Sequence, residues 1–140
     1  MKNAILVLSV IAVVILLFLS ASKSKPTTGN AFEKQDLIRN EFPEPNGAVE
    51  SPLKVRGIAR GLWFFEASFP AVILDANGKV LGRGVLQAQR EWMTEDFVPY
   101  SGEISFENSS TKNGTLVLEK DNPSGLPEHD DRLIIPISFK

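Results

Sequence analysis

The chain carries two hydrophobic patterns, a continuous apolar run at its beginning and an alternation with period two after Gly47. Residues 3–22 have no charged side chain, and thirteen of the eighteen residues at positions 4–21 are Ile, Leu, Val or Phe. As a helix rising about 1.5 Å per residue, this run would span roughly 27 Å, close to the ~30 Å hydrocarbon core of a bilayer. The pattern predicts that residues 1–22 form one transmembrane helix or a signal segment.

Two interpretations of residues 1–22 stay open. Signal peptides usually have apolar regions of only about 7–15 residues, which favours an uncleaved anchor that contacts membrane lipid through residues 4–21. Small residues at Ser20, Ala21 and Ser22 also suit a cleavage site. Both interpretations export the C-terminal part of the chain.

Residues 23–47 are polar and contain three prolines, at positions 26, 43 and 45. They lack a sustained apolar period, so we expect a flexible linker. Asn30 followed by Glu33 resembles a helix capping box. The alternative is therefore a short docking helix, with one side lined by Phe32, Leu37, Ile38 and Phe42.

Alternating apolar and polar residues predict strands throughout residues 48–140. The clearest segments are 53–60, 71–74, 79–81, 103–107, 115–119 and 132–139. Asn77-Gly78 suits a hairpin turn, and Pro136, which has no N–H, favours an edge position or a bulge. About seven short strands in this length predict an all-β, antiparallel sandwich of immunoglobulin-like size.

Several short motifs, taken in order, resemble the bacterial spore germination immunoglobulin-like domain, a family associated with GerM-type proteins. They are Ser51-Pro52-Leu53, 63–69, Asn77-Gly78, Trp92-Met93-Thr94-Glu95, Phe97-Val98-Pro99-Tyr100, Gly114-Thr115-Leu116 and 121–127. The resemblance covers about residues 46–140. It implies a sandwich module outside the cytoplasmic membrane of a bacterium, with a role in binding or assembly and no catalytic residues.

Composition and charge exclude several functions. The net charge is −2, and residues 26–140 contain 12 Lys and Arg against 17 Asp and Glu, so we expect no nucleic-acid partner. Cys is absent and His129 is the single histidine, which excludes thiol catalysis and Cys-based or multi-His zinc sites. Nucleophile-elbow and P-loop patterns are also missing. We therefore expect no enzyme activity, no cofactor and no metal.

The candidate ligand-binding residues are Trp63, Trp92 and Tyr100, whose rings could stack on a glycan or peptide. Core packing is the competing interpretation, because each ring can bury about 150–250 Å² in a small domain without disulfides. Glu66 lies in the same apolar stretch, and we expect a structural ion pair there. The oxygen-rich segment 121–131 is a weaker candidate for cation binding, because it lacks the regular spacing of an EF-hand.

Together, these patterns predict a non-catalytic envelope protein with an anchor or signal at 1–22, a linker at 23–47 and a sandwich at 48–140. We expect the sandwich to act as a protein-interaction or assembly module, whose partner is an unknown envelope protein or cell-wall component. The alternative function is binding of cell-wall glycan or another ligand. The location is the bacterial cell envelope, with the domain outside the cytoplasmic membrane, or the medium if the first segment is cleaved.

Overall fold

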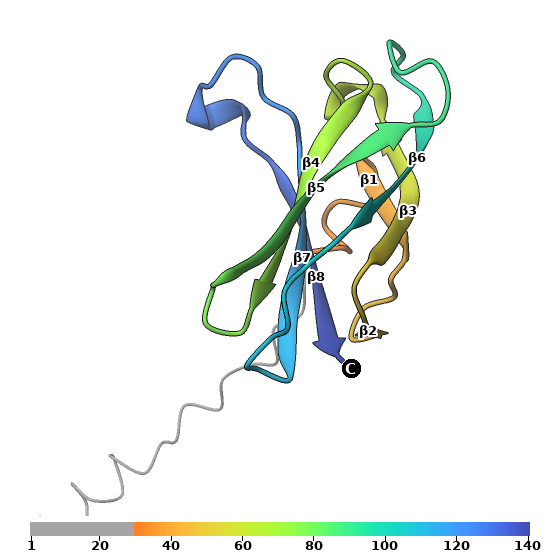
Figure 1. Ribbon diagram of the computed structural model, residues 1–140. Helices are drawn as coiled ribbons and strands as arrows, with labels where there is room; N and C mark the ends of the chain where they lie inside the picture. Colours follow the sequence, from red (N-terminus) through yellow and green to blue (C-terminus); the bar gives the residue numbers. More distant parts are fainter. Residues whose placement is uncertain (1–29) are drawn as a thin grey trace, which may run out of the picture.

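The computed structural model describes residues 30–140, which form eight strands and two short 3-10 turns (Figure 1). No α-helix occurs in this range, so none of the described helical segments is long and apolar enough to cross a membrane. The transmembrane or signal segment expected at 1–22 lies outside the described residues. The elements are β1 Ile38–Phe42, β2 Ala48–Val49, β3 Leu53–Arg60, η1 Gly61–Trp63, β4 Ser68–Asp75, β5 Val80–Ala88, β6 Phe97–Ile104, β7 Asn113–Glu119, η2 Pro127–His129 and β8 Arg132–Phe139.

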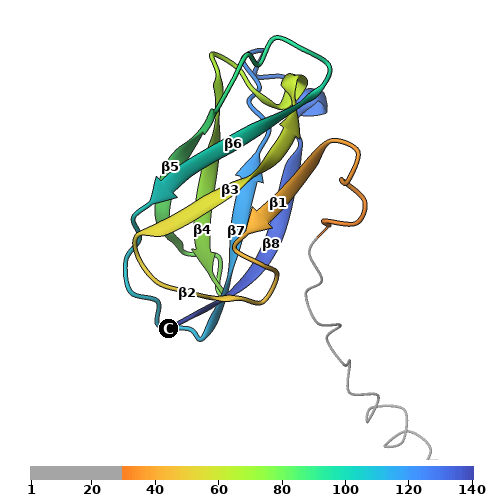
Figure 2. The same ribbon diagram turned by 90° about the vertical axis from the view of Figure 1, so that its right-hand side faces the viewer.

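All eight strands belong to one hydrogen-bonded sheet in the order β1-β3-β6-β5-β4-β7-β8-β2. Figure 2 shows that this sheet folds into two layers, with β1, β3 and β6 in front of β4, β7 and β8. The fold occurs between β5 and β6, which share only the pairs Gln87↔Ser101 and Ala88↔Tyr100. The all-β sandwich is confirmed. The purely antiparallel arrangement is not, because β2 pairs with β8 in parallel.

The core follows from the alternation in the sequence. In β3 the odd-numbered positions 53–59 are all buried, and in β8 Leu133, Ile135 and Ile137 are buried while their neighbours are more exposed. Each strand therefore turns one face toward the opposite layer, as the period of two requires. The central aromatic side chain is Phe69, which contacts Trp63, Phe64 and Tyr100 in edge-to-face arrangements.

The expected strands are present with some shifts in their limits. The hairpin around Asn77-Gly78 joins β4 to β5, and Asp75 Oδ1 accepts hydrogen bonds from the N–H groups of Asn77 at 2.8 Å and Lys79 at 2.9 Å. The strand expected at 103–107 lies earlier, at Phe97–Ile104. Pro136 lies in β8, which is not an edge strand, but β2 pairs only with Ser138 and Phe139, so no strand pairs with Pro136 on the side away from β7.

Residues 30–47 of the segment expected to be a linker or docking helix are part of the domain, and residues 23–29 lie outside the described residues. Ile38–Phe42 forms β1, which pairs with β3 through Ile38↔Ala59, and Ile38 is 1% exposed. Asn30 does not cap a helix. Its side chain bonds to β8 instead, donating to the carbonyl of Arg132 at 2.9 Å and accepting from the N–H of Ile134 at 2.8 Å. The domain therefore begins before residue 48, because Ile38 gains more by burial in the core than on a solvated helix.

Candidate functional site

Three loops emerge at the same end of the sandwich, opposite the C-terminus (Figure 1). They connect β3 to β4, β5 to β6, and β7 to β8. The first two carry exposed apolar side chains: Leu62 is 54% exposed, Phe65 41% and Met93 72%. Trp92 is half-buried beside Phe65, with the two ring centroids 6.5 Å apart at an angle of 72°. We call these four residues the apolar loop patch.

The β3–β4 loop sends two adjacent aromatic side chains into the core and the apolar side chains on either side of them into solvent. Trp63 and Phe64 enter the core at 0% and 4% exposure, whereas Leu62 and Phe65 face solvent. Phe65 and Ser68 then close a two-residue hairpin loop with reciprocal backbone hydrogen bonds of 3.0 and 3.1 Å. This loop fixes the direction in which Phe65 leaves the domain.

The residues inside this turn adopt a conformation that is costly for them. Glu66 has a φ of 49° and Ala67 a φ of 63°, as in a type I′ turn, which normally contains Asn and Gly. A left-handed conformation costs a residue with a side chain roughly 1–2 kcal/mol. Such strain is found most often at binding and active sites, where it holds a group in place. Glu66 itself is exposed, and no salt bridge within residues 30–140 includes it, so the ion pair expected there does not form.

The β5–β6 loop presents Met93 at the tip of a tight turn. The N–H of Thr94 donates to the carbonyl of Trp92 at 2.8 Å, and the Met93 N–H donates to Glu91 Oε1 at 2.9 Å. Both bonds fix the backbone on either side of Met93 and leave its side chain free. An exposed methionine held in this way is available to a partner, because its thioether adapts to irregular surfaces.

Gly61 joins the two loops into one unit. Its N–H donates to the carbonyl of Asp96 at 3.2 Å. A Cβ at this position would collide with the backbone carbonyl oxygens of Trp92 and Thr94. The close approach of the two backbones therefore requires glycine. The two loops that carry the four side chains of the patch are thus held together at Gly61.

Four exposed carboxylates lie on the same two loops as the apolar loop patch, close to its residues in the sequence. The set consists of Glu66, Glu91, Glu95 and Asp96. Among the described residues, none of the four takes part in a salt bridge. The patch is thus an apolar centre with a negatively charged rim.

Three arginines, Arg39, Arg60 and Arg90, lie beside Phe97 at this end, and each donates to a backbone carbonyl. Arg60 donates to the carbonyls of Asp36 at 3.0 Å and Glu95 at 3.3 Å, and its guanidinium lies 3.9 Å from the centre of the Phe97 ring. Arg90 donates to the carbonyl of Phe97. Among the described residues, none of these guanidinium groups forms an ion pair with the rim.

The three residues that the sequence proposed for ligand binding lie in different environments. Trp63 is fully buried, and its indole N–H has no hydrogen-bond partner among the described residues. Tyr100 is 1% exposed and donates its hydroxyl to Asn40 Oδ1 at 2.9 Å. Burial raises the pKa of the Tyr100 phenol, and the Glu41 carboxylate adds to the increase. Trp92 is the member of the three whose ring reaches the surface.

Leu62 and Met93 were not predicted from the sequence as binding residues, and Phe65 was considered only as part of the aromatic stretch 63–69. In the sequence Phe65 lies between the core residues Phe64 and Phe69. The pattern of apolar residues therefore does not indicate whether the Phe65 side chain faces the core or solvent. Met93 offered a usable signal, because it is a large apolar residue within a charged loop that runs from Glu91 to Asp96.

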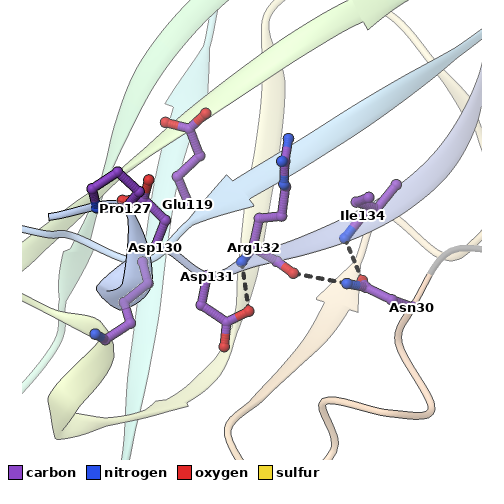
Figure 3. Close-up of a pocket in the computed structure, with 8 residues that line it drawn as sticks. Asn30, Glu119, Pro127, Asp130, Asp131, Arg132 and Ile134 are labelled. Atoms are coloured by element: carbon purple, nitrogen blue, oxygen red, sulfur yellow. Dashed lines mark hydrogen bonds between the residues drawn. The ribbon is translucent and has the colours of Figure 1, made fainter.

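A cavity of about 620 Å³ lies between Asn30 and the β7–β8 loop, and most of its lining is polar (Figure 3). Three of its charged side chains are bonded within the domain. Asp131 pairs with Lys34, Asp130 accepts from Asn122 at 2.7 Å, and Lys120 donates to the carbonyl of His129 at 3.1 Å. These bonds connect the β7–β8 loop and the segment before β1 to the domain, which indicates a structural role.

Cation binding by segment 121–131, the weaker candidate, gains no support from this arrangement. Within residues 30–140, no group of three or more His, Cys, Asp or Glu side chains is placed to hold a metal ion. The oxygen atoms of this segment are instead distributed along an exposed loop.

Comparison with known proteins identifies the family. The sequence model of the immunoglobulin-like domain of bacterial spore germination (Gmad2) matches residues 37–125, more than half of the chain, and the protein belongs to this family. The match begins at β1, earlier than the expected start near residue 46, and ends within the β7–β8 loop. No curated protein and no solved structure matches the chain. The family is typically non-enzymatic.

Proposed function

We propose that this protein is a non-catalytic, membrane-anchored component of the bacterial cell envelope whose immunoglobulin-like domain binds another protein. The membrane anchor is the apolar run at 4–21, and the contact surface is the apolar loop patch. The family membership supports a non-catalytic module, and the observation that carries the proposal is the exposure of the patch on two braced loops.

The energetics of the patch favour a partner. Burial of a Phe or Met side chain is worth about 1.5–3 kcal/mol relative to full exposure, and part of this energy remains available at Phe65 and Met93. Aromatic residues and Met are enriched in protein interfaces, and a few central side chains supply most of the binding energy. A support that already holds these side chains in place reduces the entropy lost on binding.

Site-specific crosslinking tests the proposal. A photoreactive amino acid would replace Met93 in the full chain, expressed in its native membrane. The matched control is Val85 on β5, which is apolar and 54% exposed but lies on a strand, away from the loops. We expect a discrete protein adduct from position 93 that is absent from position 85 and is lost with Trp92→Ala. Equal adducts from both positions, or none from position 93, would contradict the proposal.

Glycan binding is a second candidate, because the Trp92 ring reaches the surface beside Phe65. Co-sedimentation of the full chain with purified peptidoglycan separates the two functions. A protein-binding module stays in the supernatant. Sedimentation that Trp92→Ala abolishes would instead favour the glycan.

A further inference from the structure

We infer that the partner presents apolar residues flanked by Lys and Arg, so that the contact combines burial of the apolar loop patch with charge attraction at its rim. This inference rests on the proposed function and specifies the chemistry of the partner at the same surface.

The first observation is the position of the rim charges relative to the patch. Glu91 directly precedes Trp92, and the Glu91 carboxylate accepts a hydrogen bond from the N–H of Met93. Glu66 directly follows Phe65 in the strained turn. A partner that covers these apolar side chains therefore also approaches the carboxylates next to them.

The second observation is that the rim keeps its charge. Arg60 and Arg90 are the nearest cations along the two loops, and both donate to backbone carbonyls. Elsewhere in the described part of the chain, four carboxylates have ion-pair partners. Examples at the opposite end are Lys79–Glu107 at 3.5 Å and Lys140–Glu50 at 3.4 Å.

Carboxylates without an ion-pair partner, placed beside apolar side chains, select the partner by sign. Complementary charge accelerates encounter and excludes partners of like charge, and the effect decreases as salt screens it. An anionic lipid surface or an acidic glycan would be repelled by the rim at the distance where Met93 makes contact. The arrangement therefore favours a basic protein surface over both.

The test uses variants that remove rim charge and preserve the loop. Glu91→Gln combined with Glu95→Gln removes two charges, and the amide introduced at position 91 keeps a side-chain oxygen that can accept the Met93 N–H. The matched control is Glu44→Gln with Glu103→Gln, which removes two exposed carboxylates outside the loop patch. Circular dichroism and thermal melting of the full chain verify that both variants are folded.

The probe is a random peptide display library selected on the full chain, followed by affinity measurement of the enriched peptides. We expect apolar residues flanked by Lys or Arg, and binding several-fold weaker with the rim variant or in about 0.5 M salt, as for an interaction with charge steering. The Glu44/Glu103 control should bind as the parent does. Enriched peptides without basic residues, or equal affinity for the rim variant, would overturn the inference.

A third variant distinguishes this failure from failure of the proposed function. Trp92→Ala with Met93→Ala removes the centre of the patch and leaves the rim charges. If the peptides and the crosslinked protein are unaffected by this variant, the proposed contact surface is wrong. If they are lost with this variant but unaffected by the rim variant, only the charge pattern of the partner is wrong.

Discussion

The strained turn between Phe65 and Ser68 gives a prediction with a matched control in the same sheet. Ala67 has a φ of 63° although it carries a side chain, and Gly78 has a φ of 82° in the β4–β5 hairpin. A Cβ added at Gly78 would meet no atom within 4 Å, so Gly78→Ala introduces only the conformational cost. Ala67→Gly removes the corresponding cost.

The size of both effects follows from two opposing terms. A left-handed conformation costs a residue with a side chain roughly 1–2 kcal/mol. Glycine loses about 0.5–1 kcal/mol more backbone entropy than alanine on folding. The difference predicts that Ala67→Gly stabilises the domain by about 0.5–1 kcal/mol and that Gly78→Ala destabilises it by a similar amount. The expected change in Tm is roughly 2–8 °C in opposite directions.

Urea denaturation of both variants measures the two free energies of unfolding, and a double variant tests whether they cancel. The turns lie at opposite ends of β4, so their effects should be additive. Destabilisation by Ala67→Gly would refute the assignment of strain, because the methyl group would then contribute packing that outweighs it. Crosslinking from position 93 should remain unchanged in either variant.

Three further predictions concern the core and the N-terminal contacts. Burial raises the pKa of Tyr100 above its ordinary value near 10, so the unfolded chain loses the phenol proton at a lower pH than the folded domain. Above about pH 10 the free energy of unfolding should therefore fall by about 1.4 kcal/mol per pH unit. Tyr100→Phe should abolish this contribution in alkaline melting curves. Trp63→Ala should lower the free energy of unfolding by about 3–5 kcal/mol in urea denaturation, because Trp63 is fully buried. Trp92→Ala should lower it much less but abolish the crosslink from position 93. The reverse order of the two stability losses would contradict the assigned environments. Asn30→Ala should lower the free energy of unfolding by about 1–2 kcal/mol and accelerate hydrogen exchange at the Ile134 amide, which donates to the Asn30 side chain. Unchanged exchange would show that another group protects this amide.

The strands were predicted best where one face of the strand is buried against the opposite layer, because apolar and more polar residues then alternate along the sequence. Along β3 and β8 each inward residue is apolar, and the strands were found at these positions. β1 was missed because Ile38 is its single buried residue, and the remaining positions face solvent or are only partly covered. An edge strand of this kind depends on its partner strand for stability, and the sequence of the segment alone does not reveal that partner.

The site could be predicted only in part for a related reason. A pattern with period two applies inside strands, whereas the direction of Phe65 and Met93 is set by turns and by the contact of two loops at Gly61. Trp92 was selected for its residue type. Its exposed neighbours were not, because loop side chains acquire their direction from tertiary contacts.

The most direct test of the central claim is oxidative footprinting of Met93 in the intact envelope. The chain contains two methionines, and Met93 is 72% exposed in the isolated domain, so peroxide should oxidise it readily in purified protein. We predict slower formation of the sulfoxide at Met93 in the envelope, with the fast rate restored by Trp92→Ala. Equal rates in the envelope and in purified protein would show that no partner covers this end of the domain.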